Sequence, residues 1–550
     1  MNRYISDEIK MDTYATWLNG KKIVINAPTG TGKTTFILTG LLPYCRSRGK
    51  KMLILCNRRL LRQQYGFELA DYYDCYRELI AGVDVLTYQA LAEKSSDYQA
   101  FQRMLKEYDI VICDETHYFY GDSDFNSVGT YSLLQKIILA CFYKCIIMIT
   151  ATFSEVKPLI EKTYKKCAEK LSQNGNIGIH FSQFRYCNDI YDFQSWCDYS
   201  RLTCLYTYDV ETLVEEIANS EKKTLVFIDD KQKAEAFKKM LIKTNGVKDN
   251  EVFLLNAQIM DERIHDEVIQ ALAVQHKVRP KIIITTSVLD NGISIHDEDV
   301  GNIVIATDSR VSFIQMVGRI RAESTRQCNL YIFPRDFRYY EKRISQYEEK
   351  MRWYEELEEG NLDLYALDLL RYGWIGKDGK AEFLRNAIVI TDKSTEYYTE
   401  RKSNVYIQRG EVTLAINEFA KEKTGNMLLA MKRFYKLSLQ SPERVAQEQI
   451  AWLGKKPEEL CVLDSSYQVK REEELKKTLL QIQEFSLEQL SKMKAQLAKE
   501  FRKDLLKDIV KKDGSFSKEK LQDICADFGL YLETTEGKDK KNRYTVKEKA

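Results

Sequence analysis

A glycine-rich stretch near the N-terminus has the residue types that bind a phosphate chain. APTGTGKTT, residues 27–35, follows the apolar run KIVIN and precedes the helix-like FILTGLL. A turn between strand and helix directs consecutive backbone N–H groups toward an anion, and the helix dipole adds to the attraction. The expected nucleotide-binding residues are therefore Thr29, Gly30, Thr31, Gly32, Lys33 and Thr34.

Two side chains of this stretch have distinct expected roles. Lys33 is expected against the β- and γ-phosphates of ATP, and the Thr34 hydroxyl on Mg²⁺. The general phosphate-loop pattern has glycine where Ala27 stands. The alternative is a structural turn that binds no nucleotide, but the strand before it and the helix after it favour the phosphate loop.

Two carboxylates close a second apolar run, DIVICDETH, at residues 109–117. Asp114 is expected to hold Mg²⁺ through its water shell, and Glu115 to orient and deprotonate the attacking water. His117 has no partner for a metal site and is expected to couple the ATP site to a neighbouring domain. The alternative is a solvated strand end. ATP and Mg²⁺ are therefore the cofactors that the sequence predicts.

Short apolar runs alternate with helical patterns from residue 1 to about 335. Continuous β-branched runs are typical of strands buried on both faces, and strands that alternate with helices imply right-handed crossovers and a parallel sheet. Five runs end near Thr152 and four more begin near Thr224. The fold expected is α/β, with parallel-sheet domains at 1–155 and 205–335 and a connecting segment at 156–204.

The sequence pattern changes after about residue 335 from short apolar runs to long charged segments with helical spacing. This pattern predicts a mainly helical accessory region over 336–550. These helices are expected to pack on their own domain; the alternative is a coiled-coil surface for a protein partner. Residues 516–549 predict either a winged-helix-like DNA-binding end or a solvated tail with a small hairpin. Asp392, with Glu400 and Lys402, loosely suits a metal-dependent nuclease core.

Composition narrows the class of protein. The chain has 550 residues and a net charge of +2, so any basic nucleic-acid surface must be local. No apolar run reaches the roughly 18 residues of a membrane helix, and the N-terminus MNRYISDEIK has no apolar signal core. Thirteen scattered cysteines without a CxxC pair, and five dispersed histidines, predict reduced thiols and no zinc cluster. We therefore expect a cytoplasmic protein.

The order of these motifs resembles that of the superfamily 2 helicases, in the DExH group. APTGTGKT resembles their motif I, including the alanine at its start, DETH resembles motif II, and TLVFIDDKQKAEAF (224–237) resembles motif IV. The resemblance covers residues 1 to about 335. It implies two tandem RecA-like domains and ATP-dependent helicase activity.

Further stretches extend the resemblance and imply roles for single residues. CNRRLLRQQ (56–64) resembles motif Ia, VLTYQAL (85–91) the motif after it, TAT (150–152) motif III and TTSVLDNGISI (285–295) motif V. The match implies that Thr150 and Thr152 link the two domains and that Gly292 lies near the nucleotide. The residues implied to contact nucleic acid are Arg58, Gln63, Thr87 and Thr286.

QMVGRIRA, residues 315–322, resembles motif VI, in which an arginine of the second domain neutralises charge on the γ-phosphate. Gln315 and Arg319 match the family pattern and are the expected catalytic residues of that domain. The second arginine of the pattern is displaced by one residue, to Arg321. On a helix this shift rotates the side chain by about 100°, so Arg321 is expected to face either the first domain or nucleic acid, with Arg326 as another substitute.

The sequence thus predicts an ATP-dependent helicase or translocase that moves on single-stranded DNA, with RNA as the second choice. The altered motif VI keeps an alternative open, namely an ATP-gated nucleic-acid clamp or sensor without unwinding activity. Motif V followed by QMVGRIR also resembles helicases of phages, large DNA viruses and mobile elements. No glutamine precedes motif I, so Tyr4 or Arg3 is expected on the adenine, or Tyr4 in a packing role.

Overall fold

The fold is known from a computed structural model. It describes residues 4–28, 30–74, 80–95, 97–124, 126, 128–173, 186–193, 199–243, 247–256, 258–259, 266–286, 289, 295–319, 327–361, 383, 386–393, 398–399, 405–406, 412–463, 522, 525, 530–536 and 542–548. The chain divides into two compact units, Met1–Val462 and Leu463–Ala550. Over the described residues, no helix combines the length and the apolar character that a membrane span requires.

Six parallel strands form the first sheet, in the order β3-β2-β4-β5-β1-β6. Their bounds are β1 (Lys22–Asn26), β2 (Met52–Cys56), β3 (Val83–Thr87), β4 (Ile110–Cys113), β5 (Cys145–Thr150) and β6 (Asp189–Asp192). Successive side chains of a strand point to opposite faces, so Val24 and Ile25 of β1 lie in different apolar cores. The predicted strands β1, β2, β4 and β5 are thus buried on both faces, whereas β3, at the sheet edge, is buried only in part. β6 comes from the segment predicted as a connection.

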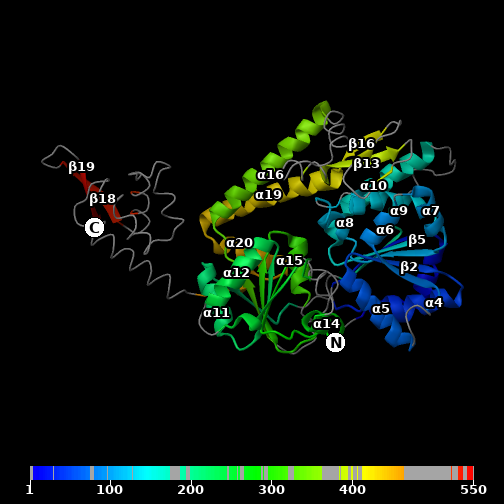
Figure 1. Cartoon of the computed structure of the whole chain (residues 1–550), viewed down its shortest axis with the longest axis horizontal. Coiled ribbons are helices and arrows are strands. Elements are labelled where there is room, and N and C mark those ends of the chain that lie inside the picture. The colour runs from blue at the N-terminus through cyan, green and yellow to red at the C-terminus, as the bar shows by residue number, and fades with distance from the viewer. Residues whose placement is uncertain are drawn as a thin grey trace. The chain divides into compact units, whose positions relative to one another are not determined.

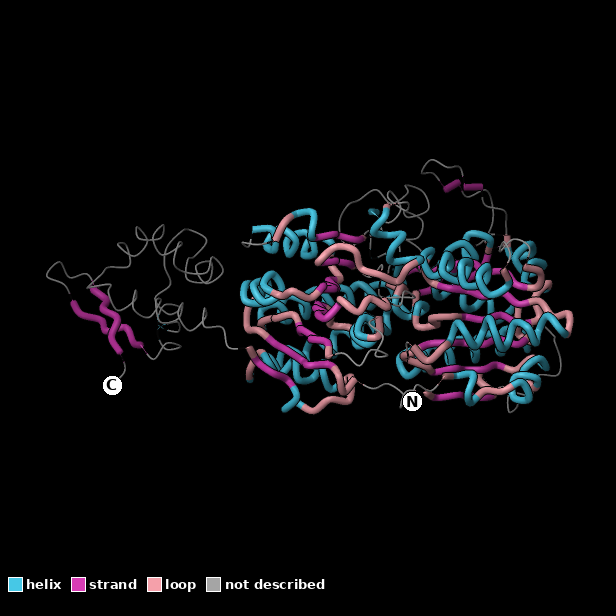
Figure 2. The backbone as a smooth tube through the Cα atoms, turned by 90° about the horizontal axis from the view of Figure 1, so that it is seen from below, coloured by secondary structure: helices cyan, strands magenta, loops and turns pink. Residues whose placement is uncertain are grey.

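Helices cover both faces of this sheet, and Figure 2 shows the strands between helical layers. The helices are α1 (Ile5–Glu8), α2 (Met11–Ala15), α3 (Lys33–Thr35), α4 (Leu42–Ser47), α5 (Arg59–Tyr73), α6 (Tyr88–Lys94), α7 (Tyr98–Lys106), α8 (Tyr118–Gly121), α9 (Leu133–Ala140) and α10 (Phe153–Gln173). A π-helical turn, η2 (Phe36–Leu41), joins α3 to α4.

The second sheet has seven parallel strands in the order β17-β7-β12-β11-β8-β10-β9. The strands are β7 (Leu202–Tyr206), β8 (Lys223–Ile228), β9 (Val252–Leu255), β10 (Ile282–Thr285), β11 (Val300–Ala306), β12 (Cys328–Ile332) and β17 (Leu460–Val462). The helices α11 (Val210–Asn219), α12 (Lys231–Lys243), α14 (Glu267–Val274) and α15 (Arg310–Val317) connect them. Two parallel α/β sheets in tandem therefore form two RecA-like domains, as the sequence predicts.

Two long helices, α16 (Phe337–Glu356) and α19 (Glu418–Gln440), run side by side after the second domain (Figure 1). Two antiparallel strand pairs come between α16 and α19 in the sequence. They are β13 (Ile388–Lys393) with β16 (Val412–Ile416) and β14 (Tyr398–Thr399) with β15 (Val405–Tyr406). The helix α20 (Glu443–Ala451) follows α19. We call α16, α19 and α20 together the helical bridge, because its two ends contact different domains.

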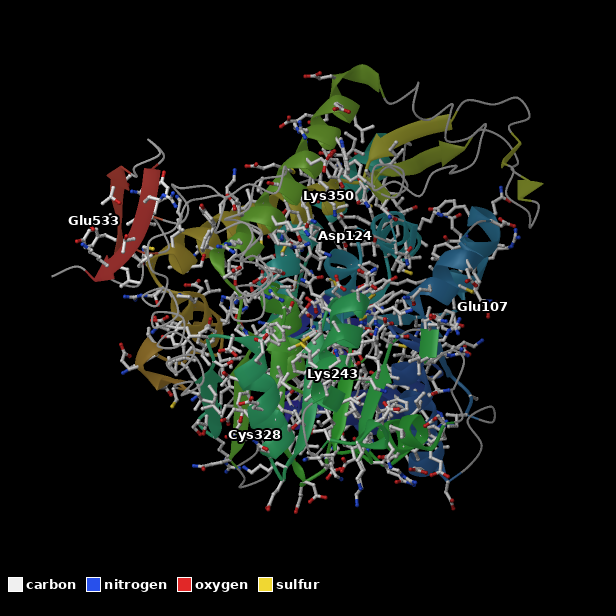
Figure 3. The ribbon with its side chains drawn as sticks, turned by 60° about the vertical axis from the view of Figure 1, so that its left-hand side comes forward. Glu107, Asp124, Lys243, Cys328, Lys350 and Glu533 are labelled. Carbon is white, nitrogen blue, oxygen red and sulfur yellow. The ribbon has the colours of Figure 1, made fainter. Side chains whose placement is uncertain are left out.

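The N-terminal end of α19 is anchored to the first domain. Asn417, fully buried, caps α19 through Ala420 and donates from Nδ2 to the Ser123 oxygen at 3.0 Å and to the Asn386 oxygen at 2.8 Å. Lys423 pairs with Asp124 at 2.6 Å, and Figure 3 labels Asp124. These contacts reach the residues directly after α8.

The other end of the bridge is anchored to the second domain. Gln449 of α20, buried, donates from Nε2 to the Thr307 oxygen at 2.8 Å. Asp308 accepts from Arg335 and, at 2.7 Å, from the Tyr339 hydroxyl of α16. Thr307 and Asp308 lie between β11 and α15, so the bridge is fixed directly beside the helix that carries Gln315.

Replacing Asn417 by alanine is expected to destabilise the chain. The change removes a helix cap and leaves two buried carbonyl oxygens without their amide donor, at a cost of about 2 kcal/mol. A thermal unfolding experiment on the full chain is expected to show a midpoint lower by about 4 °C. Asn426→Ala is the matched control, because Asn426 is exposed and makes one side-chain bond, to Tyr120; equal midpoints for the two variants would contradict the anchor.

The second unit is described at Leu463, Gln522, Cys525 and a hairpin. Strands β18 (Leu530–Glu536) and β19 (Asn542–Glu548) pair antiparallel, with Leu530 opposite Glu548. Residues 464–521, part of the accessory region predicted as mainly helical, lie outside the described residues. The winged-helix-like end therefore stays a prediction.

Candidate active site

The glycine-rich loop between β1 and α3 contains two glycines with left-handed backbone. Gly30 and Gly32 have φ angles of 87° and 75°, which side chains with a Cβ adopt only with strain. A Cβ on Gly32 would also stand 3.0 Å from the Tyr4 ring. The Ile5 N–H donates to the Thr31 oxygen at 3.0 Å, so α1 supports the loop. This arrangement places Tyr4 in packing contact with the loop.

Lys33 and Thr34 begin the helix after the loop. The Lys33 Nζ lies 3.4 Å from the Ala27 oxygen and 3.6 Å from Glu115 Oε1. Thr34 is the second residue of α3. The lysine therefore faces the acidic residues that follow β4, as a lysine holding phosphates near a hydrated metal would.

Asp114 is buried after β4, and both of its carboxylate oxygens are fixed. Oδ1 accepts from the Glu115 N–H at 2.9 Å, and Oδ2 accepts from the Tyr65 hydroxyl at 2.8 Å. Burial and the neighbouring charge of Glu115 raise the pKa of Asp114 above its usual range. Burying the Asp114 charge is costly, and a bound cation would offset that cost, so the buried carboxylate fits a functional site.

Glu115 has the backbone strain and the charge environment of a functional residue. Its φ of 51° is left-handed, a conformation that costs a non-glycine residue of order 1 kcal/mol. Burial would raise the pKa of Glu115, but Lys33 and then His117 and Arg319 hold it below the ordinary value. Glu115 is therefore ionised, and its oxygens can accept hydrogen bonds.

His117 joins three of the predicted site residues. Its Nδ1 lies 3.3 Å from Glu115 Oε2 and 3.4 Å from the Thr150 hydroxyl. The Gln315 amide of the second domain lies 2.8 Å from the same nitrogen. Thr152 donates its N–H to the Thr150 hydroxyl at 3.2 Å. Buried polar contacts thus connect the Glu115 carboxylate, through His117, to Gln315 of α15.

Arg319 crosses between the domains. Its side chain is 2% exposed, its Nε donates to the Gln315 oxygen at 3.1 Å, and its Nη2 lies 3.9 Å from Glu115 Oε1. At the surface, Arg310 of α15 pairs with Glu155 of α10 at 2.6 Å. Oxygen Oε1 of Glu115 therefore stands between Lys33 of the first domain and Arg319 of the second.

The residues predicted to contact nucleic acid are spread over strand ends and helices. Thr87 caps α6 through Ala90, and Thr286 follows β10 and donates its N–H to the Leu255 oxygen at 3.3 Å. Arg58 pairs with the buried Asp122 at 3.1 Å. Gln63 lies on α5 and is half-buried. A phosphate contact by Arg58 would therefore have to share its guanidinium with Asp122.

Several predicted site residues lie outside the described part of the chain: Thr29, Gly292, Arg321 and Arg326. Their roles stay predictions. The same holds for the nuclease hypothesis, because Asp392 belongs to β13 whereas Glu400 and Lys402 are outside the described residues.

Three residues that lie around the site, outside its expected catalytic and binding groups, have no signal in the sequence. Tyr65 bonds to the Asp114 carboxylate, Tyr88 donates to the Asp114 main-chain oxygen at 2.8 Å, and Asp122 holds Arg58. Tyrosine is a common residue of buried helix faces, so type and spacing alone do not separate these two from ordinary core tyrosines. Only the three-dimensional contacts identify them.

The assembled residues fit a magnesium nucleotide. The loop offers backbone N–H groups at a helix start. The space beside Gly30 is open, because a Cβ added to this glycine would meet no atom of the described residues within 4 Å. Lys33 and Arg319 supply positive charge from two directions, and Asp114 with Thr34 supplies the oxygen ligands that Mg²⁺ prefers.

Known protein families match the same two regions. Residues 4–155 match the family model described as type III restriction enzyme, res subunit. Residues 209–323 match the helicase conserved C-terminal domain. No curated protein matches the chain.

Solved structures with a similar fold include three helicases. Dbp5 of S. cerevisiae, bound to RNA and ADP BeF3, is 16% identical with a TM-score of 0.39, and the match covers 57% of this chain and 79% of that one. Lhr of Mycobacterium smegmatis, bound to ssDNA and AMP-PNP, is 16% identical with a TM-score of 0.40 over 58% and 45%. The Escherichia coli DEAH/RHA helicase HrpB is 14% identical with a TM-score of 0.38 over 58% and 42%. The chain thus spans less than half of the last two.

Proposed function

We propose that the chain is an ATP-driven motor on nucleic acid, because its two RecA-like domains match, at residues 4–155 and 209–323, the family models of a restriction-enzyme res subunit and of the helicase conserved C-terminal domain. The proposed activity is ATP hydrolysis between the two RecA-like domains, coupled to movement along one strand. Single-stranded DNA is the favoured track and RNA the second choice. A cytoplasmic location, a protein partner on the C-terminal helices and the resemblance to helicases of phages, viruses and mobile elements stay predictions.

The proposed chemistry assigns each buried group a task. The loop N–H groups and Lys33 hold the phosphates of ATP. Glu115 orients the attacking water and accepts its proton, since its carboxylate lies beside Lys33 and Arg319, the two cations expected on the phosphates. Arg319 neutralises the charge that develops on the γ-phosphate oxygens. Mg²⁺, held by Thr34 and Asp114, would supply further charge neutralisation.

One observation carries the coupling part of the proposal. Arg319 and Gln315 of the second domain approach Glu115 and His117 of the first, all four of them buried. Hydrolysis then requires both domains, and ATP favours their approach because its γ-phosphate binds cations from each. A strand bound to both domains would be advanced by this cycle.

The decisive experiment is ATP turnover by the full chain alone and with single-stranded DNA, duplex DNA or RNA. A motor is expected to be stimulated by its track, and strand displacement on substrates with either overhang then gives direction. Stimulation without strand displacement or movement would support the alternative function, an ATP-gated clamp or sensor. Turnover that no nucleic acid changes would contradict both functions.

Lys33→Ala is expected to weaken ATP binding by about 10- to 100-fold, the cost of removing a charged hydrogen bond to phosphate. A fluorescent ATP analogue measures the affinity directly. Lys50→Ala is the control, because Lys50 pairs with Asp109 before β4, at the other end of the sheet. Unchanged binding in Lys33→Ala would remove the loop from the site.

A further inference from the structure

Tyr65 is a buried tyrosine that no motif explains. It lies on α5, is 0% exposed, and packs in the apolar core beside Leu61 and Ile54. Within that core its hydroxyl reaches Asp114 Oδ2 at 2.8 Å. The second oxygen of the same carboxylate is taken by the Glu115 N–H. The two bonds together fix the rotation of the Asp114 carboxylate.

The hydroxyl of Tyr65 is the donor in this bond. In a bond between a phenol and an ionised carboxylate the phenol is the donor, because the carboxylate offers only lone pairs. Asp114 in turn can present to solvent only the lone pairs that Tyr65 and Glu115 leave unused.

Helix α5 ties this hydroxyl to surroundings outside the site. Its N-cap residue Arg58 pairs with Asp122, and Arg62 donates from Nε to the Val85 oxygen at 3.2 Å. The helix also lies beside α14 of the second domain. Arg58 at its N-cap and Gln63 within it are residues predicted to contact nucleic acid. A displacement of α5 would therefore change the orientation of the Asp114 carboxylate, because the Tyr65 hydrogen bond connects the two.

We propose that Tyr65 is a positioning residue for Asp114, which holds this carboxylate in the orientation that receives hydrated Mg²⁺ and makes that orientation depend on α5. The proposal rests on the proposed function, since Asp114 has this task only in a nucleotide hydrolase. Outer hydrogen bonds of this kind orient metal-binding side chains, and their loss typically costs 10- to 100-fold in metal affinity.

The chain offers a matched control for the phenol hydroxyl. Tyr88 is likewise 0% exposed and donates at 2.8 Å to Asp114, but to its main-chain oxygen. Tyr65→Phe and Tyr88→Phe therefore each delete one buried phenol hydroxyl that donates to Asp114. They differ in whether the carboxylate loses its donor.

The test is Mg²⁺ dependence of nucleotide binding by the full chain, with a fluorescent ATP analogue in EDTA and over a Mg²⁺ titration. Tyr65→Phe is expected to raise the half-maximal Mg²⁺ concentration by about 10- to 100-fold. Metal-free affinity should stay within about twofold. Excess Mg²⁺ is expected to restore most of the ATP turnover, because the metal site is weakened and the catalytic groups remain. Tyr88→Phe is expected to match the unaltered chain.

Three results would overturn the proposal. The first is an unchanged Mg²⁺ titration in Tyr65→Phe. The second is an equal shift in both tyrosine variants together with a lower thermal midpoint, which would indicate packing alone. The third is a further shift when Tyr65→Phe is added to Asp114→Asn, because a residue that acts through Asp114 adds nothing once that carboxylate is gone. If the unaltered chain itself shows no Mg²⁺-dependent nucleotide binding, the proposed function has failed instead.

Discussion

Replacement of Arg319 by alanine is expected to lower ATP turnover by about a thousandfold or more, the contribution of a guanidinium that neutralises a transferring phosphoryl group. ATP binding should weaken far less, because Lys33 and the loop N–H groups remain. Single-turnover hydrolysis and binding of a fluorescent ATP analogue measure the two quantities separately. Arg319→Lys keeps the charge but loses the planar fork, so it is expected to recover only a small part of the rate.

The surface pair between the same two domains supplies the control. Arg310, also on the second domain, pairs with Glu155 of the first at the surface. Exposed ion pairs contribute about 0–1 kcal/mol, so Arg310→Ala is expected to keep turnover within a few-fold. Equal losses in Arg310→Ala and Arg319→Ala would mean that both act by holding the domains together. Near-normal turnover in Arg319→Ala would mean that Arg319 of the second domain takes no part in ATP hydrolysis.

Glu115→Gln is expected to abolish most ATP turnover while ATP still binds. General base catalysis contributes about 10²- to 10⁴-fold, and glutamine cannot accept the proton. Binding should be at least as tight, because Lys33 and Arg319 would no longer be attracted to a carboxylate and would be available to phosphate. A trapped, unhydrolysed nucleotide after gel filtration is the expected observation.

The result that would contradict the assignment of Glu115 is specific. If Glu115→Gln hydrolyses ATP at a normal rate whereas Asp114→Asn does not, Glu115 is not the general base. Of the two carboxylates, only Asp114 would then be needed for hydrolysis. Glutamine keeps the size of glutamate at a residue with left-handed backbone, so a change in folding is not expected to obscure the result.

The strands that the sequence predicts are those with continuous apolar runs. β1, β2, β4 and β5 are buried along their whole length, as both-face burial requires. β6, with the sequence DIYD, alternates between half-buried and exposed at the sheet edge, and β17 has three residues. Such edge strands are added by neighbouring hydrogen bonds rather than by their own apolar pattern, so periodicity does not find them.

The site divides in a similar way. The loop glycines, Lys33, Asp114 and Glu115 follow from residue types at strand ends, because carboxyl ends of parallel strands meet at one edge. The contact of Gln315 with His117 requires knowing how two domains approach, which no local pattern encodes. Tyr65 is harder still to predict from the sequence, since its proposed role depends on one hydroxyl within an otherwise apolar core.

The helical bridge has a consequence for how the chain can be divided. The second RecA-like domain is discontinuous in sequence: β17 completes its sheet beside β7, and Ala446 and Ile450 of α20 belong to its core. A fragment cut after residue 335 would bare the backbone edge of β7 and an apolar surface around Phe313, which Trp452 covers. Both are aggregation hazards. Limited proteolysis is therefore expected to release the two domains together, as one resistant body through Val462.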